Sequence, residues 1–188
     1  RSAVEVATFC HAERSEASVP LAVASIEDVI RKRGSARSFR QTPSSRAAVE
    51  SIVSANAYLI VNAVVGLESG AYYFDGQELR LLRAGDYRGV AGHLDLGQEL
   101  AAHAAVNVYL LADLDEVIGR LGERGYRVAQ LQASLAAGRM YLAAYAAGLA
   151  ATGLTFFDDE VVDFFSPHAA GKSVMFLLAI GNRGRRVS

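Results

Sequence analysis

The stretch Arg33-Gly-Ser-Ala-Arg37-Ser-Phe39 decides how the rest of this chain is interpreted. It follows an expected helix that begins at Ser25-Ile-Glu-Asp28, which has the form of a capping box, and ends at Gly34. Two guanidiniums and a hydroxyl within five residues, beside a flexible glycine, can surround a phosphate group. The same residues also suit a solvated basic helix end, which the helix dipole favours. On the pattern alone, this second interpretation is favoured.

A second basic cluster lies near the other end of the chain. Gly181-Asn-Arg183-Gly-Arg185-Arg186 directly follows an expected buried strand from Ser173 to Ile180. Taken alone, this cluster is a basic tail. A fold that places the first helix beside the last strand would make one anion site from the two clusters. The sequence does not demonstrate that closure.

Length and composition indicate the class of protein that carries both clusters. The 188 residues are 52% hydrophobic and 21% charged, which is typical of a globular chain. We expect residues 21–188 to form one domain and residues 1–20 to be an N-terminal tail or arm. The net charge of −1 gives no support for nucleic-acid or membrane-surface binding. The apolar run 140–154 is too short to cross a bilayer, and we expect a cytoplasmic protein.

Cysteine and histidine usage excludes two further classes of site. Cys10 is the single cysteine, so the chain has no internal disulfide framework and no cysteine metal cluster. The four histidines lack the spacing of metal ligands, and we predict no metal site.

Strand and helix patterns alternate irregularly, which predicts an α+β fold with a mixed sheet rather than a strict βαβ order. Asp75-Gly76 between two apolar runs predicts a hairpin, and Asp113-Leu-Asp-Glu116 predicts the start of a short helix. The expected helices besides the first are Thr42–Ser54, Asp113–Gly122, Tyr126–Ala151 and a short one after Asp158, and the expected strands are 58–64, 71–74, 78–82, 105–111 and 173–180. The helix from Tyr126 is apolar on most of its circumference, so we expect a long, central and buried helix.

Several further motifs follow the opening stretch in order. They are Gly66-Leu-Glu-Ser-Gly70-Ala-Tyr-Tyr73, Leu81-Leu-Arg-Ala-Gly-Asp86-Tyr-Arg88, Arg124-Gly-Tyr-Arg127, Tyr141-Leu-Ala-Ala144 and Phe157-Asp-Asp159. With these motifs, the chain from about Ser25 to Arg186 resembles the nitroreductase superfamily, and within it the SagB-type dehydrogenase branch. The resemblance implies a mainly antiparallel sheet flanked by helices, and a noncovalently bound FMN.

The resemblance also assigns the cofactor site residue by residue. It implies that the N-terminal motif and the C-terminal arginines hold the FMN phosphate and ribityl chain, and that a short backbone segment lies against the isoalloxazine ring. The residues are Arg33, Gly34, Ser35 and Arg37, then Arg183 and Arg185, and for the ring Gly153, Leu154 and Thr155. Without the resemblance, Gly153-Leu154 would be an ordinary helix stop. We assign no catalytic residue. Tyr126 is a candidate proton donor or stacking residue, but a packing aromatic with a satisfied hydroxyl is the favoured interpretation.

The implied activity is an FMN-dependent oxidoreductase that transfers two electrons or a hydride through the flavin. The resemblance implies NAD(P)H as the electron donor, a small electron-poor organic acceptor, and a homodimer with FMN at its interface. The alternatives are a peptide-modifying dehydrogenase that acts with partner proteins, and a non-catalytic flavin-binding dimeric module. Three departures from the family bear on this choice: Phe156 where a small residue is common, Arg120-Leu121 where peptide-modifying relatives have Lys-Tyr, and the short junction 54–57 where relatives have a longer loop.

Overall fold

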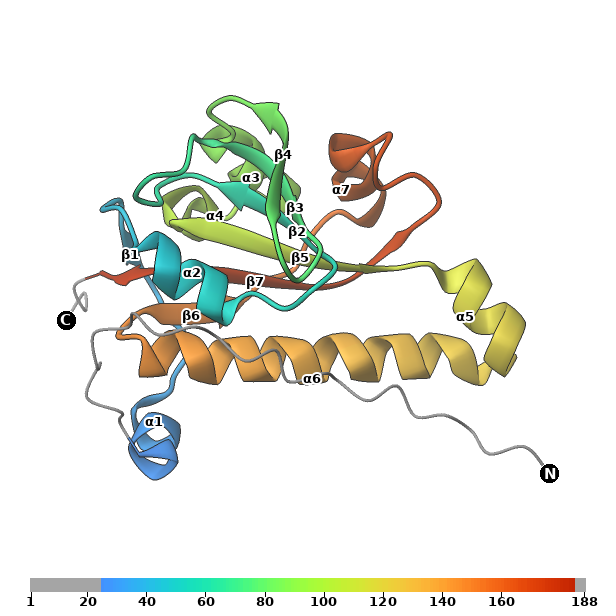
Figure 1. Ribbon diagram of the computed structural model, residues 1–188, viewed down its shortest axis with the longest axis horizontal. Coiled ribbons are helices and arrows are strands. Elements are labelled where there is room, and N and C mark those ends of the chain that lie inside the picture. Colours follow the sequence, from blue (N-terminus) through green and yellow to red (C-terminus); the bar gives the residue numbers. More distant parts are fainter. Residues whose placement is uncertain (1–24, 185–188) are drawn as a thin grey trace.

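A computed structural model describes residues 25–184. The predicted arm at residues 1–20 lies outside the described residues, and so does Arg185. The predicted α+β fold is confirmed: one seven-stranded antiparallel sheet lies between two groups of helices (Figure 1).

The sheet has the strand order β1-β7-β5-β2-β3-β4, and β6 pairs with β7 along the same edge as β1. All the paired strands run antiparallel. The strands are β1 (Phe39–Arg40), β2 (Ala57–Val61), β3 (Gly70–Phe74), β4 (Leu79–Ala84), β5 (Val106–Ala112), β6 (Ala150–Gly153) and β7 (Ser173–Arg183).

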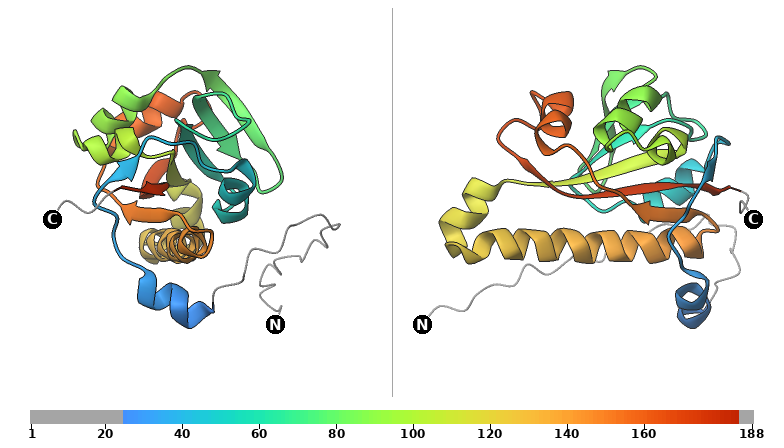
Figure 2. Two further views of the ribbon diagram at one scale, coloured as in Figure 1. Left: turned by 90° about the vertical axis from the view of Figure 1, so that its left-hand side faces the viewer. Right: turned by 180° about the vertical axis from the view of Figure 1, so that it is seen from behind.

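The helices cover both faces of this sheet. Helices α2 and α6 pack on one face, while α3 and α7 pack on the other (Figures 1 and 2). The helices are α1 (Ile26–Lys32), α2 (Arg46–Ile52), α3 (Arg88–Leu94), α4 (Glu99–His103), α5 (Leu114–Leu121), α6 (Arg124–Ala146) and α7 (Asp158–Phe165).

The long helix α6 runs beneath the sheet and buries one stripe of mainly alanine side chains. Ala129, Ala133, Ala137, Met140 and Ala144 recur at spacings of three or four residues, so they share one helix face. This face packs against the core cluster formed with β2, β5 and β7.

The opposite face of α6 is open to solvent in the single chain. Leu131 and Leu135 are 60% and 56% exposed. The helix also ends earlier than predicted, at Ala146, because Gly148 adopts a positive φ of 76° and the chain turns into β6. Residues 150 and 151, which we expected at the end of the helix, are therefore in a strand.

Most of the predicted local signals are confirmed. The Ser25 side chain accepts a hydrogen bond from the Asp28 N–H at 3.1 Å, and Asp113 caps α5 in the same way through Glu116. Asp75 Oδ1 accepts from the N–H groups of Gln77 and Glu78, which holds the hairpin between β3 and β4.

The predicted start of α2 at Thr42-Pro43 is wrong, because long-range pairing holds this backbone extended. The Ser44 N–H donates to Ala63 O, and the Val65 N–H donates to Ser44 O, both at 2.9 Å. The helix can begin only after this bridge, so Ser45 becomes its N-cap. Helices α3 and α4 and the two-residue strand β1 have no counterpart among the predicted elements.

Candidate functional site

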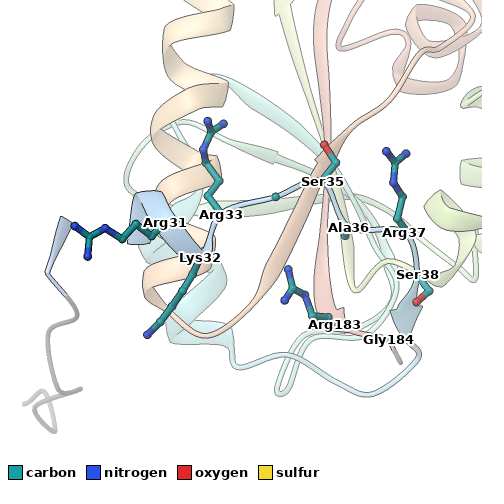
Figure 3. A pocket seen from close by; sticks show the side chains of 10 residues that line it. Arg31, Lys32, Arg33, Ser35, Ala36, Arg37, Ser38, Arg183 and Gly184 are labelled. Atoms are coloured by element: carbon teal, nitrogen blue, oxygen red, sulfur yellow. The ribbon is translucent and has the colours of Figure 1, made fainter. Parts of the chain in front are cut away.

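A cavity of about 400 Å³ lies where the end of α1, the loop into β1 and the end of β7 meet (Figure 3). Strand β1 pairs with β7 with Phe39 opposite Arg183, and the Gly184 N–H donates to Ser38 O at 2.9 Å. A side chain at Gly184 would not fit, since an added Cβ would lie 2.7 Å from Ser38 Cβ. The closure that the sequence left open is therefore present for the described residues: Arg183 and Gly184 of the C-terminal cluster line one cavity with the first cluster.

Three arginines face this cavity. In Figure 3, Arg33 and Arg37 stand on either side of Ser35, and Arg183 extends between them from β7. The other two cations of the lining, Arg31 and Lys32, point away.

None of the three facing arginines forms an ion pair with a carboxylate of residues 25–184. Their charge is therefore available to a ligand. Three guanidinium groups around one hydroxyl match the oxygens of a phosphate group.

Two tyrosines of α6 hold the loop that carries Ser35. Tyr141 Oη donates to Gly34 O at 2.9 Å and is hydrogen-bonded to Ser35 Oγ at 3.3 Å, and Tyr145 Oη also donates to Gly34 O. The loop is fixed from the other side by a bridge to Ala151, where the Ala36 N–H donates to Ala151 O at 3.0 Å. Ser35 is thereby held in place by α6 and β6 together.

The same tyrosines also position the arginines. Arg183 Nη2 donates to Tyr145 Oη at 3.2 Å, and its guanidinium lies 5.6 Å from the centre of that ring. The Arg33 guanidinium lies 5.8 Å from the Tyr141 ring. Sequence reasoning assigned no role to these tyrosines. The signal that could have found them is their spacing of four residues, which puts both rings on one helix face.

The predicted ring-contacting segment begins close to Ser35. Because Ser35 bridges to Ala151, Gly153 follows only two residues along β6, a distance of about 7 Å. Gly153 and Thr155 are exposed, whereas the Leu154 N–H is engaged with Leu177 O at 3.3 Å. The segment is the end of a strand, so the helix-stop interpretation of Gly153-Leu154 is wrong.

Helices α3 and α4 fix the rest of this segment. Gln98 Nε2 donates to Thr155 Oγ1 at 3.3 Å, and the Phe157 N–H donates to Leu94 O at 2.8 Å. Phe156 packs against the core on the α3 and α7 side of the sheet, so its ring is directed inward.

A buried carboxyl, that of Asp95, directly follows Leu94 in the chain. Asp95, the C-cap of α3, is fully buried, and its Oδ1 accepts from Tyr109 Oη at 3.1 Å. Its Oδ2 has no hydrogen-bond partner within the described part of the chain. Burial raises the pKa of Asp95 to about 8, although the Tyr109 hydroxyl acts in the opposite direction. The carboxyl is therefore mostly protonated at neutral pH.

The other residues considered from the sequence lie elsewhere. Tyr126 is 15 residues from Tyr141 on α6, a separation of about 22 Å along the helix axis, so it is not part of this cavity. Arg120 is exposed at the end of α5 and pairs with Glu116 at 3.5 Å. The junction 54–57 joins α2 to β2 directly through Asn56 in a left-handed conformation. No cluster of three potential metal ligands occurs among residues 25–184, and no helix there is long and apolar enough to cross a membrane.

This fold has counterparts among known proteins. The sequence profile of the nitroreductase family matches residues 30–182. A protein from Anabaena variabilis described as a nitroreductase has a TM-score of 0.79 and 26% identity over 85% of this chain. The match covers only 38% of that protein. A similarly described protein from Ralstonia eutropha has a TM-score of 0.71 and 16% identity, and the match covers 90% of this chain and 88% of that one.

A third structure is the Escherichia coli microcin synthetase McbBCD complex with a truncated pro-MccB17 bound. It has a TM-score of 0.68 and 13% identity, and the match covers 92% of this chain and 77% of that chain. No curated protein sequence is similar enough to this chain to count as a relative.

Proposed function

The chain belongs to the nitroreductase family, and from this premise we propose that it is an FMN-dependent oxidoreductase. The observation that carries the proposal is the cavity in which Arg33, Arg37 and Arg183 face Ser35 without a carboxylate partner among the described residues. A surplus of positive charge around a backbone loop that is held on both sides suits a phosphate monoester.

Different residues of this site would contact different parts of the cofactor. Arg33, Arg37 and Arg183 would hold the phosphate, with Arg185 contributing from beyond the described residues. Gly34 and Ser35 would contact the phosphate and ribityl chain. The backbone of Gly153, Leu154 and Thr155 would lie against the ring, where an N–H group can stabilise negative charge. Bound FMN supplies the two-electron chemistry, and the chain supplies binding, orientation and electrostatics.

We further propose NAD(P)H as the donor and a small electron-poor organic molecule as the acceptor. Exposure of Gly153 and Thr155 supports this, because both reactants need access to the segment beside the ring. We name no residue as the proton donor.

A homodimer is part of the same proposal. Leu131 and Leu135 on the outer face of α6 and Ile26 and Ile30 on α1 are between 53% and 60% exposed. Large apolar side chains repeated at a spacing of four residues on two helices are typical of an interface between subunits.

A second candidate is a peptide-modifying dehydrogenase that works with partner proteins. The fold similarity to a chain of the McbBCD complex supports this candidate. Arg120-Leu121 opposes it, because these residues stand where peptide-modifying relatives have a Lys-Tyr pair. A flavin-binding module without turnover is the remaining alternative.

Cofactor content and turnover test these proposals together. The purified protein should be yellow and should release FMN on denaturation, because the cofactor is held noncovalently. It should also oxidise NADH or NADPH when a quinone or nitroarene is supplied. Colourless protein that does not bind added FMN would contradict the flavin proposal. Flavin-loaded protein that consumes no reductant with any acceptor would favour the non-catalytic module.

A further inference from the structure

A second cavity, of about 540 Å³, lies between β3, β4 and the C-terminal end of α7. Figure 1 shows where these three elements lie in the fold. The cavity belongs to the sheet face that α3 and α7 cover. Strand β4 forms the opposite edge of the sheet from β6. Five strand spacings separate β4 from β6, the strand to which the Ser35 loop is bridged, which places this cavity roughly 24 Å or more across the sheet from that loop.

A β-bulge shapes the floor of this cavity. Arg83 pairs with Ala71 and Leu81 pairs with Tyr72, so Leu82 is an extra residue in β4. In a regular strand, consecutive side chains alternate between the two faces of the sheet. The bulge breaks this alternation and directs both Leu82 and Arg83 into the cavity beside Ala71.

Aromatic contacts hold Arg83 at the cavity wall. Its guanidinium lies 4.6 Å from the Phe164 ring centre and 5.2 Å from that of Tyr87, and its Nη2 donates to Phe164 O at 2.8 Å. These contacts orient the guanidinium but do not neutralise it. No carboxylate of the described residues forms an ion pair with Arg83.

His168 borders the same cavity. Burial lowers the pKa of His168, and the charges of Lys172 and Arg80 lower it further, which favours the uncharged form of its ring. Its Nδ1 is hydrogen-bonded to Tyr58 Oη at 2.9 Å. Among the described residues that line the cavity, Arg83 is the one that carries a permanent charge.

We propose that this cavity binds a small aromatic carboxylate. The ring would lie in the apolar part, between Leu82 and the rings of Phe164 and Phe165. The carboxylate would pair with the remaining N–H groups of Arg83, whose planar fork matches two carboxylate oxygens. The volume is within the usual range for small-molecule sites, about 300–1,000 Å³. This proposal does not depend on the flavin function.

Calorimetric titration of the purified full chain, with whatever flavin it carries, tests the chemistry of the occupant. The probes are 2-naphthoate, its neutral amide 2-naphthamide, and the cationic 2-naphthylmethylamine. We expect the carboxylate to bind at least about tenfold more tightly than the amide, and the amine to bind least tightly, because only the acid pairs with Arg83. Equal affinity for acid and amide, or no binding of the acid, would overturn the proposal.

Three variants locate the site. Arg83→Gln should abolish the preference for the acid, whereas Arg80→Gln should leave it within about twofold, because Arg80 already pairs with Asp75 at 3.1 Å. Ala71→Val places extra volume on the cavity floor and should weaken binding of both acid and amide.

The remaining outcomes are also decisive. Equal losses in the Arg83 and Arg80 variants would indicate general charge attraction and contradict the site. Loss of acid binding in Arg37→Ala but not in Ala71→Val would place the ligand in the cavity of the first site instead. The Ala71 variant and the wild-type comparison of acid with amide remain informative if Arg83→Gln does not fold. A protein that fails to bind FMN would refute the proposed function and leave this titration unaffected.

Discussion

Arg33 and Arg37 give the first cavity a defined geometry as well as positive charge, because the two side chains lie on opposite sides of the Ser35 hydroxyl (Figure 3). Each charge-assisted contact to a phosphate is worth roughly 1.5–3 kcal/mol. Arg33→Ala and Arg37→Ala should therefore each weaken FMN binding at least about tenfold, as measured by the change in flavin fluorescence on titration.

Arg31→Ala is the matched control for these two variants. Its side chain belongs to the same basic segment but points away from the cavity (Figure 3), so FMN affinity should change little. An equal loss in all three variants would mean that net charge, and not this arrangement, attracts the cofactor.

Tyr145 is a positioning residue by its contacts. Its hydroxyl donates to Gly34 O and accepts from Arg183 Nη2. Tyr145→Phe keeps the ring and removes both hydrogen bonds, so FMN affinity should fall about two- to tenfold. The measurement is the FMN dissociation constant, with Tyr126→Phe on the same helix as the control. An unchanged dissociation constant would show that the loop holds its shape without the hydroxyl.

Element-scale prediction from the sequence succeeded where a helix end depends on adjacent residues. The caps at Ser25 and Asp113 formed as expected, because the capping side chain and the N–H group that it accepts from are three residues apart. The start of α2 was mispredicted because Ser44 pairs with residues 63 and 65 instead. Pairing between segments about 20 residues apart leaves no local signal at Thr42-Pro43.

Helix α6 also shows which features the sequence predicts and which depend on the tertiary structure. The run of apolar residues predicted a helix buried on most sides, but the single chain covers only the stripe from Ala129 to Ala144. Periodicity cannot tell a core-facing residue from one that another subunit covers. The exposed Leu131 and Leu135 are therefore the residues through which the dimer proposal can be tested.

Replacing both leucines with glutamate should separate the subunits. The change puts two charges into the proposed interface and leaves the buried stripe intact, so the monomer should stay folded. We expect the dimer dissociation constant to rise more than about thirtyfold, measured by light scattering during size-exclusion chromatography. Leu81→Glu on the edge strand β4 is the control, since Leu81 is 45% exposed at the far side of the sheet. A double variant that remains as dimeric as the wild type would refute this interface.

At the scale of the whole molecule, the buried Asp95 links folding stability to pH. The pKa of this carboxyl rises from an ordinary 3.8 to about 8 in the folded chain, because burial disfavours the charged form. Between these values the folded state keeps a proton that the unfolded state releases. The free energy of unfolding should therefore decrease as pH rises from about 4 to about 8, by up to about 1.4 kcal/mol per pH unit from this group.

Asp95→Asn should remove this contribution, because the amide is neutral at every pH and can still accept from the Tyr109 hydroxyl. Chemical denaturation of both proteins at about pH 5 and about pH 9 provides the measurement. The variant should gain stability relative to the wild type as pH rises and should be the more stable protein at the higher pH. A stability difference that stays constant across this range would mean that Asp95 does not carry the proton.

The sequence alone determined the features that depend on neighbouring residues: the helix caps, the Asp75-Gly76 hairpin, the order of the motifs and the α+β class. It also determined which residues could bind a phosphate, since this depends on their chemistry. Only the tertiary structure decided which of them meet. The pairing of β1 with β7 brings Arg183 to Arg33, and α6 brings Tyr145 to Gly34. The bulge in β4 that turns Arg83 into the second cavity likewise follows from its register with β3. Contacts between distant segments form only when the whole sheet and its helices bury their apolar faces together, so no local stretch of sequence encodes them.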